Sequence, residues 1–344
     1  MGDNVAWSDG VDPKSPAFQI AASTAKRMRV IAGPGTGKSF AMKRRVARLL
    51  EDGIKPKEIL SVTFTRVAAE DLHRELIHLG VPGCDDLEGR TLHSLGLQIL
   101  SRKHVFSALG RTPQPLNHFE EDLLLCDLKA LFGGKTKAGE LLQEYVSAWA
   151  VAQGDEPGFP ANSEQEKFAK AALDWLKFHQ AMLIGEIVPY LLLYLKHNPA
   201  AEEHAEFKHV LTDEYQDLNK AEQTIMSYLS ANAHACIVGD DDQSIYSFKF
   251  AHPEGIREWH TINPGTSDHA LDECQRCPTT VVEMANALIA HNQNRKPRVL
   301  KGIAAKGKGD VEIVQLKTLA GEVNWIVDRV VDLTENQSVL PGEI

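Results

Sequence analysis

The sequence predicts an α/β fold in which a parallel sheet is interrupted by a long all-helical segment. Two apolar stretches, 28–33 and 59–64, are typical of buried strands, and each is followed by a helical pattern. This alternation of strand and helix indicates parallel pairing. Strand-like stretches then stop, and they return at 207–214 and 234–241. We therefore expect one sheet built from two separated parts of the chain.

Helical periodicity fills the interval between these two parts. Few β-branched runs occur there, and turn-forming residues separate the helical stretches. The segments with this pattern are 119–132, 138–152, 164–182 and 186–197. Further along, a strand at 269–274 and a helix at 279–292 indicate a new α/β unit. A strand at 310–316 and a helix at 322–334 would continue it.

The expected domain boundaries follow from this pattern. Residues 1–95 and 205–265 would form the first α/β domain, and 96–204 would form a helical insertion. Residues 266–344 would begin a second α/β domain. We expect the chain to be part of a longer protein, because an incomplete parallel sheet is an unusual place for a chain to end.

Composition places few limits on function. The 344 residues are 43% hydrophobic and 24% charged, which is ordinary for a globular protein. No apolar run has the length of a membrane span, so we expect no membrane partner. The net charge of −10 argues against a general nucleic-acid binder, although one groove can still be basic.

The cysteines favour a reducing compartment, and we expect a cytoplasmic protein. Their number, five, is odd, and they are scattered along the chain. Cys274 and Cys277 form a CxxC pair, but no second pair lies at a spacing suited to zinc. We interpret them as two ordinary thiols.

A glycine-rich loop between the first strand and its helix predicts a phosphate site. Glycines allow backbone N–H groups to surround a phosphate, and the positive end of the following helix points to the same place. Lys38 would contact the β- and γ-phosphates, and the Ser39 hydroxyl would bind Mg²⁺. The residues expected to bind the nucleotide are Ala32, Gly33, Pro34, Gly35, Thr36, Gly37, Lys38 and Ser39.

Two later strand ends carry residues suited to the same nucleotide. Asp213 and Glu214 follow the strand that ends near 212, where Asp213 would serve Mg²⁺ and Glu214 would deprotonate the attacking water. Gln243 follows the next strand and could contact the γ-phosphate. Tyr246 and Phe248 come just after it and could stack on bases, although core packing of both rings is a serious alternative.

These segments together resemble the UvrD/Rep family of superfamily 1 DNA helicases. The stretches AGPGTGKS, VTFTRVAAEDL, TLHS, DEYQDLN, VGDDDQSIYSF and LDECQRCPTTVVEMANALI resemble family motifs in the family's order, over about residues 15–344. The resemblance implies a RecA-like P-loop NTPase fold with an all-helical insertion, followed by the start of a second RecA-like domain.

The resemblance also implies roles for individual residues. Gln19 would read the adenine, Gln243 would couple the γ-phosphate to DNA, and Arg276 would reach the γ-phosphate. With Lys38 and Glu214, Gln243 and Arg276 complete the expected catalytic group. The expected contacts to single-stranded DNA are Phe64, Thr65, His93, Tyr246 and Phe248.

Several positions depart from the family pattern. Gln275 stands where the family usually has a tyrosine that stacks on adenine, and Arg66 stands in place of an asparagine. Phe248, Lys249 and Phe250 replace the usual Trp-Arg-Gly. No motif V or motif VI, which holds a second catalytic arginine, occurs before Ile344.

The resemblance implies an ATP-driven motor on single-stranded DNA for the whole protein, moving 3′ to 5′ and using ATP and Mg²⁺. The alternative is a non-motor module that binds nucleotide and DNA. A P-loop ATPase of signalling or transport has less support, because it would not explain DEYQD together with DDDQSIY.

Overall fold

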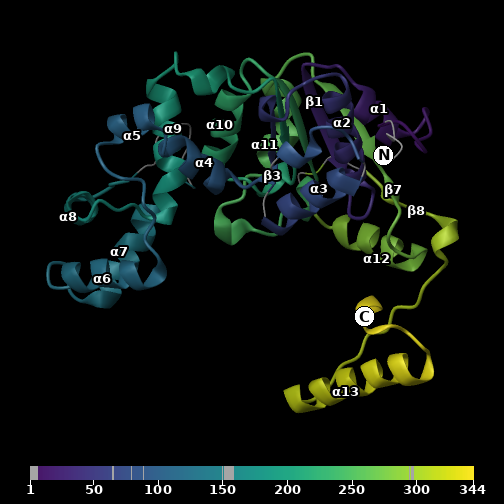
Figure 1. Cartoon of the computed structure of the whole chain (residues 1–344). Coiled ribbons are helices and arrows are strands. Elements are labelled where there is room, and N and C mark those ends of the chain that lie inside the picture. Colours follow the sequence, from purple (N-terminus) through teal and green to yellow (C-terminus); the bar gives the residue numbers. More distant parts are fainter. Residues whose placement is uncertain are drawn as a thin grey trace.

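The computed structural model describes residues 7–63, 66–78, 80–87, 89–148, 150, 159–293, 295 and 298–344. Its centre is a six-stranded, wholly parallel sheet in the order β3-β2-β4-β5-β1-β6 (Figure 1). The strands are β1 Arg27–Ala32, β2 Ile59–Val62, β3 Gly89–Arg90, β4 His209–Thr212, β5 His234–Gly239 and β6 Ser267–Leu271. The predicted α/β class, with one sheet drawn from two separated parts of the chain, is confirmed.

Both faces of the sheet are covered by helices, because successive strand residues point to opposite faces. Ala235 and Ile237 of β5 face one apolar core, and Cys236 and Val238 face the other. The helices of the first core are α4 Leu92–Leu100, α9 Ile187–His197, α10 Lys220–Leu229 and α11 Glu254–Ile262. Those of the second are α1 Pro16–Ala22, α2 Lys38–Glu51 and α3 Arg66–His78.

The insertion is helical, as predicted. No strand forms among the described residues of 96–204, where the one β-like contact is an isolated bridge between Pro115 and Met182. Its outer part has an apolar core of its own and lies away from the sheet (Figure 1). The remaining insertion helices are α5 Lys103–Leu109, α6 His118–Leu128, α7 Lys135–Ser147 and α8 Ser163–Phe178.

The structure corrects the expected place of one strand. We expected a strand at 269–274 to begin the second unit, but 267–271 forms β6 at the edge of the main sheet. β6 pairs with β1, from Met28 opposite Ser267 to Ala32 opposite Leu271. Without β6, one side of β1 would expose unpaired backbone groups. A small unit does follow, made of β7 Glu273–Cys274, α12 Thr279–Ile289 and β8 Lys301–Gly302.

The expected strand at 310–316 does not form. That segment has no regular structure and is largely exposed, because no neighbouring strand in the described chain pairs with it. The expected helix does form as α13 Leu319–Val331, but it buries none of its residues and lies apart from the sheet (Figure 1). Among the described residues, every helix is too short or too polar to cross a bilayer.

A buried ion pair joins the two ends of the insertion, and its loss provides a test of the fold. Arg111 and Glu186 are both buried, at 2.7 Å, and Tyr145 donates a second hydrogen bond to Glu186. The Glu186→Gln variant leaves the guanidinium charge unpaired, so we expect a loss of roughly 3–5 kcal/mol in unfolding free energy. Urea unfolding followed by circular dichroism measures it.

The matched control is Asp122→Asn, which breaks the exposed pair between Asp122 and Lys135. That change should cost much less than the loss of Glu186, because water screens an exposed ion pair. Equal losses in the two variants would contradict the role assigned to the buried pair.

Candidate functional site

The glycine loop lies between β1 and α2 and has the shape that a phosphate site needs. Gly35 and Gly37 have φ of 69° and 88°, a left-handed conformation that favours glycine. Gly37 caps α2 without a side chain, so the N–H groups of the first helical turn are not covered by a capping side chain. The loop therefore combines backbone donors with the positive end of a helix, which is an anion site.

Lys38 connects this loop to the carboxyl end of β4. Its Nζ lies 2.8 Å from Glu214 Oε1 and 2.9 Å from Glu214 Oε2. Glu214 is one of four described non-glycine residues with positive φ, at 48°. Such strained positions often occur at functional sites. The predicted lysine and the predicted base are thus in direct contact.

Asp213 lies beside this pair, in surroundings that disfavour its negative charge. Burial, together with the Glu214 carboxylate, raises the pKa of Asp213 to about 6, although Lys38 opposes the shift. A carboxylate in this position fits a divalent cation, which would relieve the repulsion. Ser39, in the first turn of α2, is exposed, so its hydroxyl is available to a ligand at the glycine loop.

Gln216 links the ends of β4 and β5. Its Nε2 donates to Glu214 Oε2 at 2.9 Å, and its Oε1 accepts from the backbone N–H of Asp240 at 2.9 Å. Gly239 makes this crossing possible, since a Cβ there would lie 2.1 Å from the Gln216 oxygen. The predicted Gln243 donates to Asp240 Oδ2 at 2.7 Å, so it belongs to the same network.

The segment after β6 packs against the glycine loop. The backbone N–H of Gln275 donates to Gly35 O at 2.8 Å, and a Cβ on Gly35 would lie 2.7 Å from the Cβ of Arg276. Arg276 itself is exposed. The structure therefore places the predicted arginine next to the phosphate loop.

A cavity of about 580 Å³ lies beside the loop. It is bounded by the start of α2, by the segment before α1 and by the region of β6 and β7. Thr36, Gly37, Phe40 and Gln275 line it. Gln19 is exposed on α1 but is not among the lining residues. Phe40 presents an aromatic ring here that the sequence analysis did not select.

A second cavity, of about 410 Å³, lies between the sheet and the helical insertion, and we call it the insertion cavity. His93, Phe248, Lys249, Phe250 and Glu222 are among its lining residues. Phe248 is 71% exposed, so core packing does not explain it.

The other predicted DNA contacts have different outcomes. Tyr246 is half-buried, and its ring centroid lies 5.8 Å from that of Phe248, so the two rings are neighbours. Phe64 and Thr65 lie outside the described residues. Thr63, which precedes them, lines the insertion cavity.

The comparison with known families decides the relationship. The family described as UvrD/REP helicase N-terminal domain matches residues 15–261, which contain the glycine loop, both strand ends and the insertion. The chain belongs to the UvrD/REP helicase family. The RecA-like interpretation of the sheet is therefore confirmed.

Similar curated proteins carry helicase names. The chain is 26% identical to the ATP-dependent DNA helicase PcrA of Leuconostoc citreum over 331 residues, 90% of this chain and 43% of that protein. It is 27% identical to PcrA of Bacillus subtilis (strain 168), over 86% of this chain and 43% of that protein. DNA helicase II of Escherichia coli (strain K12) is 25% identical over 94% of this chain and 46% of its own length. The chain spans less than half the length of these relatives.

Arginines that the sequence analysis did not select neutralise the aspartates after β5 in this UvrD/REP domain. Arg298 Nη1 lies 2.9 Å from Asp241 and its Nη2 pairs with Asp240, while Arg295 Nη2 lies 2.7 Å from Asp242. Three consecutive acids in a partly buried loop require cations. The three consecutive aspartates in the sequence therefore indicated that cationic partners were needed. The sequence did not show which arginines would lie beside them.

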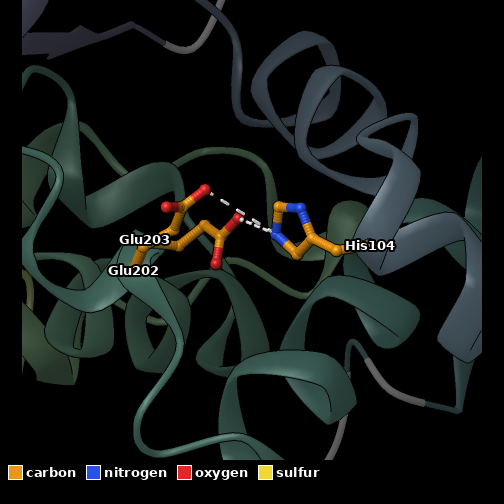
Figure 2. A group of neighbouring side chains, drawn as sticks. All are labelled: His104, Glu202 and Glu203. Atoms are coloured by element: carbon orange, nitrogen blue, oxygen red, sulfur yellow. Dashed lines mark hydrogen bonds and ion pairs between the residues drawn. The ribbon is translucent and has the colours of Figure 1, made fainter.

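A third group of side chains has the composition of a metal site, but its contacts indicate a structural role. His104, Glu202 and Glu203 gather between α5 and the turn before β4 (Figure 2). Glu203 Oε1 already accepts from His104 at 3.0 Å and from Arg102 at 2.9 Å, and Oε2 accepts from Tyr194 at 3.0 Å. The arginine thus already neutralises Glu203, and the two Glu203 oxygens already have three donors.

Glu222, which lines the insertion cavity, makes the stability of the folded protein depend on pH. It is buried at the start of α10, where it accepts the N–H of Asn219, and burial raises its pKa from 4.5 to about 7. Because the pKa is higher in the folded chain than in the unfolded chain, the protein loses stability from this group as pH rises from about 4.5 to 7.

The Glu222→Gln variant should lack this loss. At pH 8 we expect it to unfold with a free energy higher by on the order of 1–3 kcal/mol than the parent, with the difference vanishing near pH 4. Urea unfolding across this pH range measures it, with Glu258→Gln, an exposed change on α11, as the control. A Glu222→Gln variant that is less stable at pH 8 would contradict the assignment.

Proposed function

We propose that this chain is the ATP-binding and DNA-binding part of a motor that hydrolyses ATP and moves along single-stranded DNA. The observation that carries the proposal is the contact of Lys38 with Glu214, 2.8 Å across the mouth of the glycine loop. It brings the phosphate-binding cation and the expected base together at one site. Two of the similar proteins are named ATP-dependent DNA helicases, in agreement with this function.

ATP binding would begin with an exchange of partners at Lys38. The β- and γ-phosphate oxygens compete with Glu214 for the ammonium group, and the glycine loop donates its N–H groups to them. Asp213 and Ser39 would hold Mg²⁺. The bound ion would supply positive charge against the phosphates. Once Lys38 has moved to the phosphates, the Glu214 carboxylate is free to accept a proton.

Hydrolysis would then use Glu214 as the general base toward the attacking water. Gln216 holds one oxygen of Glu214, and this leaves the other oxygen to orient the water. Arg276, next to Gly35, would stabilise the charge that develops on the γ-phosphate. Gln243, which donates a hydrogen bond to Asp240, would couple the γ-phosphate to the segment that carries Tyr246 and Phe248.

The 580 Å³ cavity would receive the adenine. Phe40 offers its ring at the start of α2, and Arg44 covers that ring at 5.2 Å from its centroid. Phe40 would therefore provide the stacking surface that Gln275 lacks. Gln19, on the exposed side of α1, keeps its predicted role in reading the edge of the base.

The insertion cavity would receive the DNA strand. Phe248 and His93 would contact bases there, with Tyr246 as a neighbouring ring, and Lys249 would attract phosphate. Movement in the 3′ to 5′ direction follows from the family resemblance. We place the protein in the cytoplasm, a reducing compartment, and its five free cysteines agree with this location.

The alternative is a module that binds nucleotide and DNA without moving along the strand.

The 344 residues by themselves should bind Mg-ATP and hydrolyse it slowly, with little stimulation by DNA. Lys38 and Arg276 are present, but the sequence has no second arginine motif, and one arginine finger is worth roughly 10³–10⁵ in rate.

A steady-state ATPase assay with and without oligo-dT tests this prediction, on this chain and on a version extended to the length of the relatives. The motor proposal expects strong DNA stimulation in the extended version alone. Equal stimulation of the 344-residue chain would show that the catalytic arginines are misplaced. An extended protein that binds ATP and DNA without turnover would favour the non-motor module.

A further inference from the structure

Phe250 has a backbone conformation that is costly for its side chain. It ends the short turn Ser247–Lys249 with φ 61° and ψ 31°, in the left-handed region. A bulky residue in that region is rare, because its side chain crowds the backbone. Glycine would take the same conformation without this strain.

Packing does not account for the ring. Phe250 is 38% exposed and is not part of any of the three apolar cores. Its backbone N–H donates to Ser247 O at 2.9 Å, a bond that glycine would make equally well. Neither an apolar core nor this backbone bond therefore explains why a phenylalanine stands at this position.

The ring lies where a base would be bound. Phe250 lines the insertion cavity together with Phe248 and His93, and Lys249 stands between the two phenylalanines in sequence. The cavity, at about 410 Å³, falls within the roughly 300–1,000 Å³ of small-ligand pockets. Its other side is formed by insertion residues that include Val146 and Val188. An exposed aromatic ring at the mouth of such a cavity can cover the face of a base.

We propose that Phe250 is a base-stacking residue, which with Phe248 gives this chain two aromatic surfaces for single-stranded nucleic acid. This inference rests on the proposed function, since it assumes that the insertion cavity holds a DNA strand. The backbone strain at Phe250 is retained because the ring serves the ligand and not the fold.

The Phe250→Gly variant separates binding from folding. It should lower the affinity for oligo-dT by roughly 5- to 150-fold, the range for losing one stacked ring. Its thermal unfolding midpoint should be equal to or higher than that of the parent, because the strain is relieved. Fluorescence anisotropy with labelled oligo-dT and differential scanning calorimetry measure the two quantities.

Three controls make the result specific. Phe250→Tyr keeps the ring and should keep the affinity, while Ile245→Ala removes an exposed apolar side chain that does not line the cavity and should change nothing. A strand of abasic sites offers no face to stack on, so the parent and Phe250→Gly should bind it equally.

The outcomes distinguish this inference from the proposed function. If Phe248→Ala weakens oligo-dT binding and Phe250→Gly does not, the base-stacking role is wrong and the DNA cavity stands. If Phe250→Gly lowers stability and affinity together, or weakens abasic binding equally, the ring is structural and the inference fails. If the parent chain binds Mg-ATP but no oligo-dT, both the inference and the DNA part of the proposed function fail.

Discussion

Negative charge is concentrated where the carboxyl ends of β4 and β5 meet the glycine loop. Asp213 and Glu214 end one strand, and three consecutive aspartates follow the next. Carboxylates so close together are stable only if cations or protons neutralise them. The arrangement of the whole site depends on which groups neutralise these carboxylates.

The two strand ends meet the demand in different ways. Arg295 and Arg298 neutralise the aspartates after β5, and they thereby attach the segment after α12 to the main sheet. At β4 a single lysine, Lys38, pairs with Glu214, and Asp213 has a raised pKa beside it. The β5 side is thus satisfied within the chain, whereas the β4 side remains suited to a metal ion and to phosphates.

The glycine loop and the insertion cavity are connected by one buried amide. Gln216 donates to Glu214 at the phosphate loop and, at 3.3 Å, to Asp217, which lines the insertion cavity. Because one side chain touches both, a shift of Glu214 during the proposed ATP binding would reach the cavity through Gln216 alone. The second link passes through Asp240 and Gln243 to the segment that bears Tyr246 and Phe248.

The sequence was sufficient for the fold and for residues that act through local motifs. Periodicity located five of the six strands of the main sheet, and the glycine loop located Lys38, because both signals lie within a few consecutive residues. Periodicity missed β3, because a strand of two residues has no detectable pattern. It assigned β6 to the wrong unit, because the local sequence does not show which strand a segment will pair with. The same limit hid Phe40 and Arg298, whose roles depend on what distant segments place beside them. Phe250 was seen as a departure from the family, but its strain became evident from the backbone angle alone.

The central claim is that Lys38 is shared between Glu214 and the phosphates of ATP. Calorimetric titration of Mg-ATP into the Glu214→Gln variant tests it most directly, with Lys38→Ala for comparison. Removing the carboxylate frees the ammonium group and lowers the repulsion of the triphosphate, so Glu214→Gln should bind Mg-ATP at least as tightly as the parent while losing turnover. Lys38→Ala should lose binding by several kcal/mol, since the ammonium group that would contact the β- and γ-phosphates is then missing. A Glu214→Gln variant that binds Mg-ATP as weakly as Lys38→Ala would contradict the account.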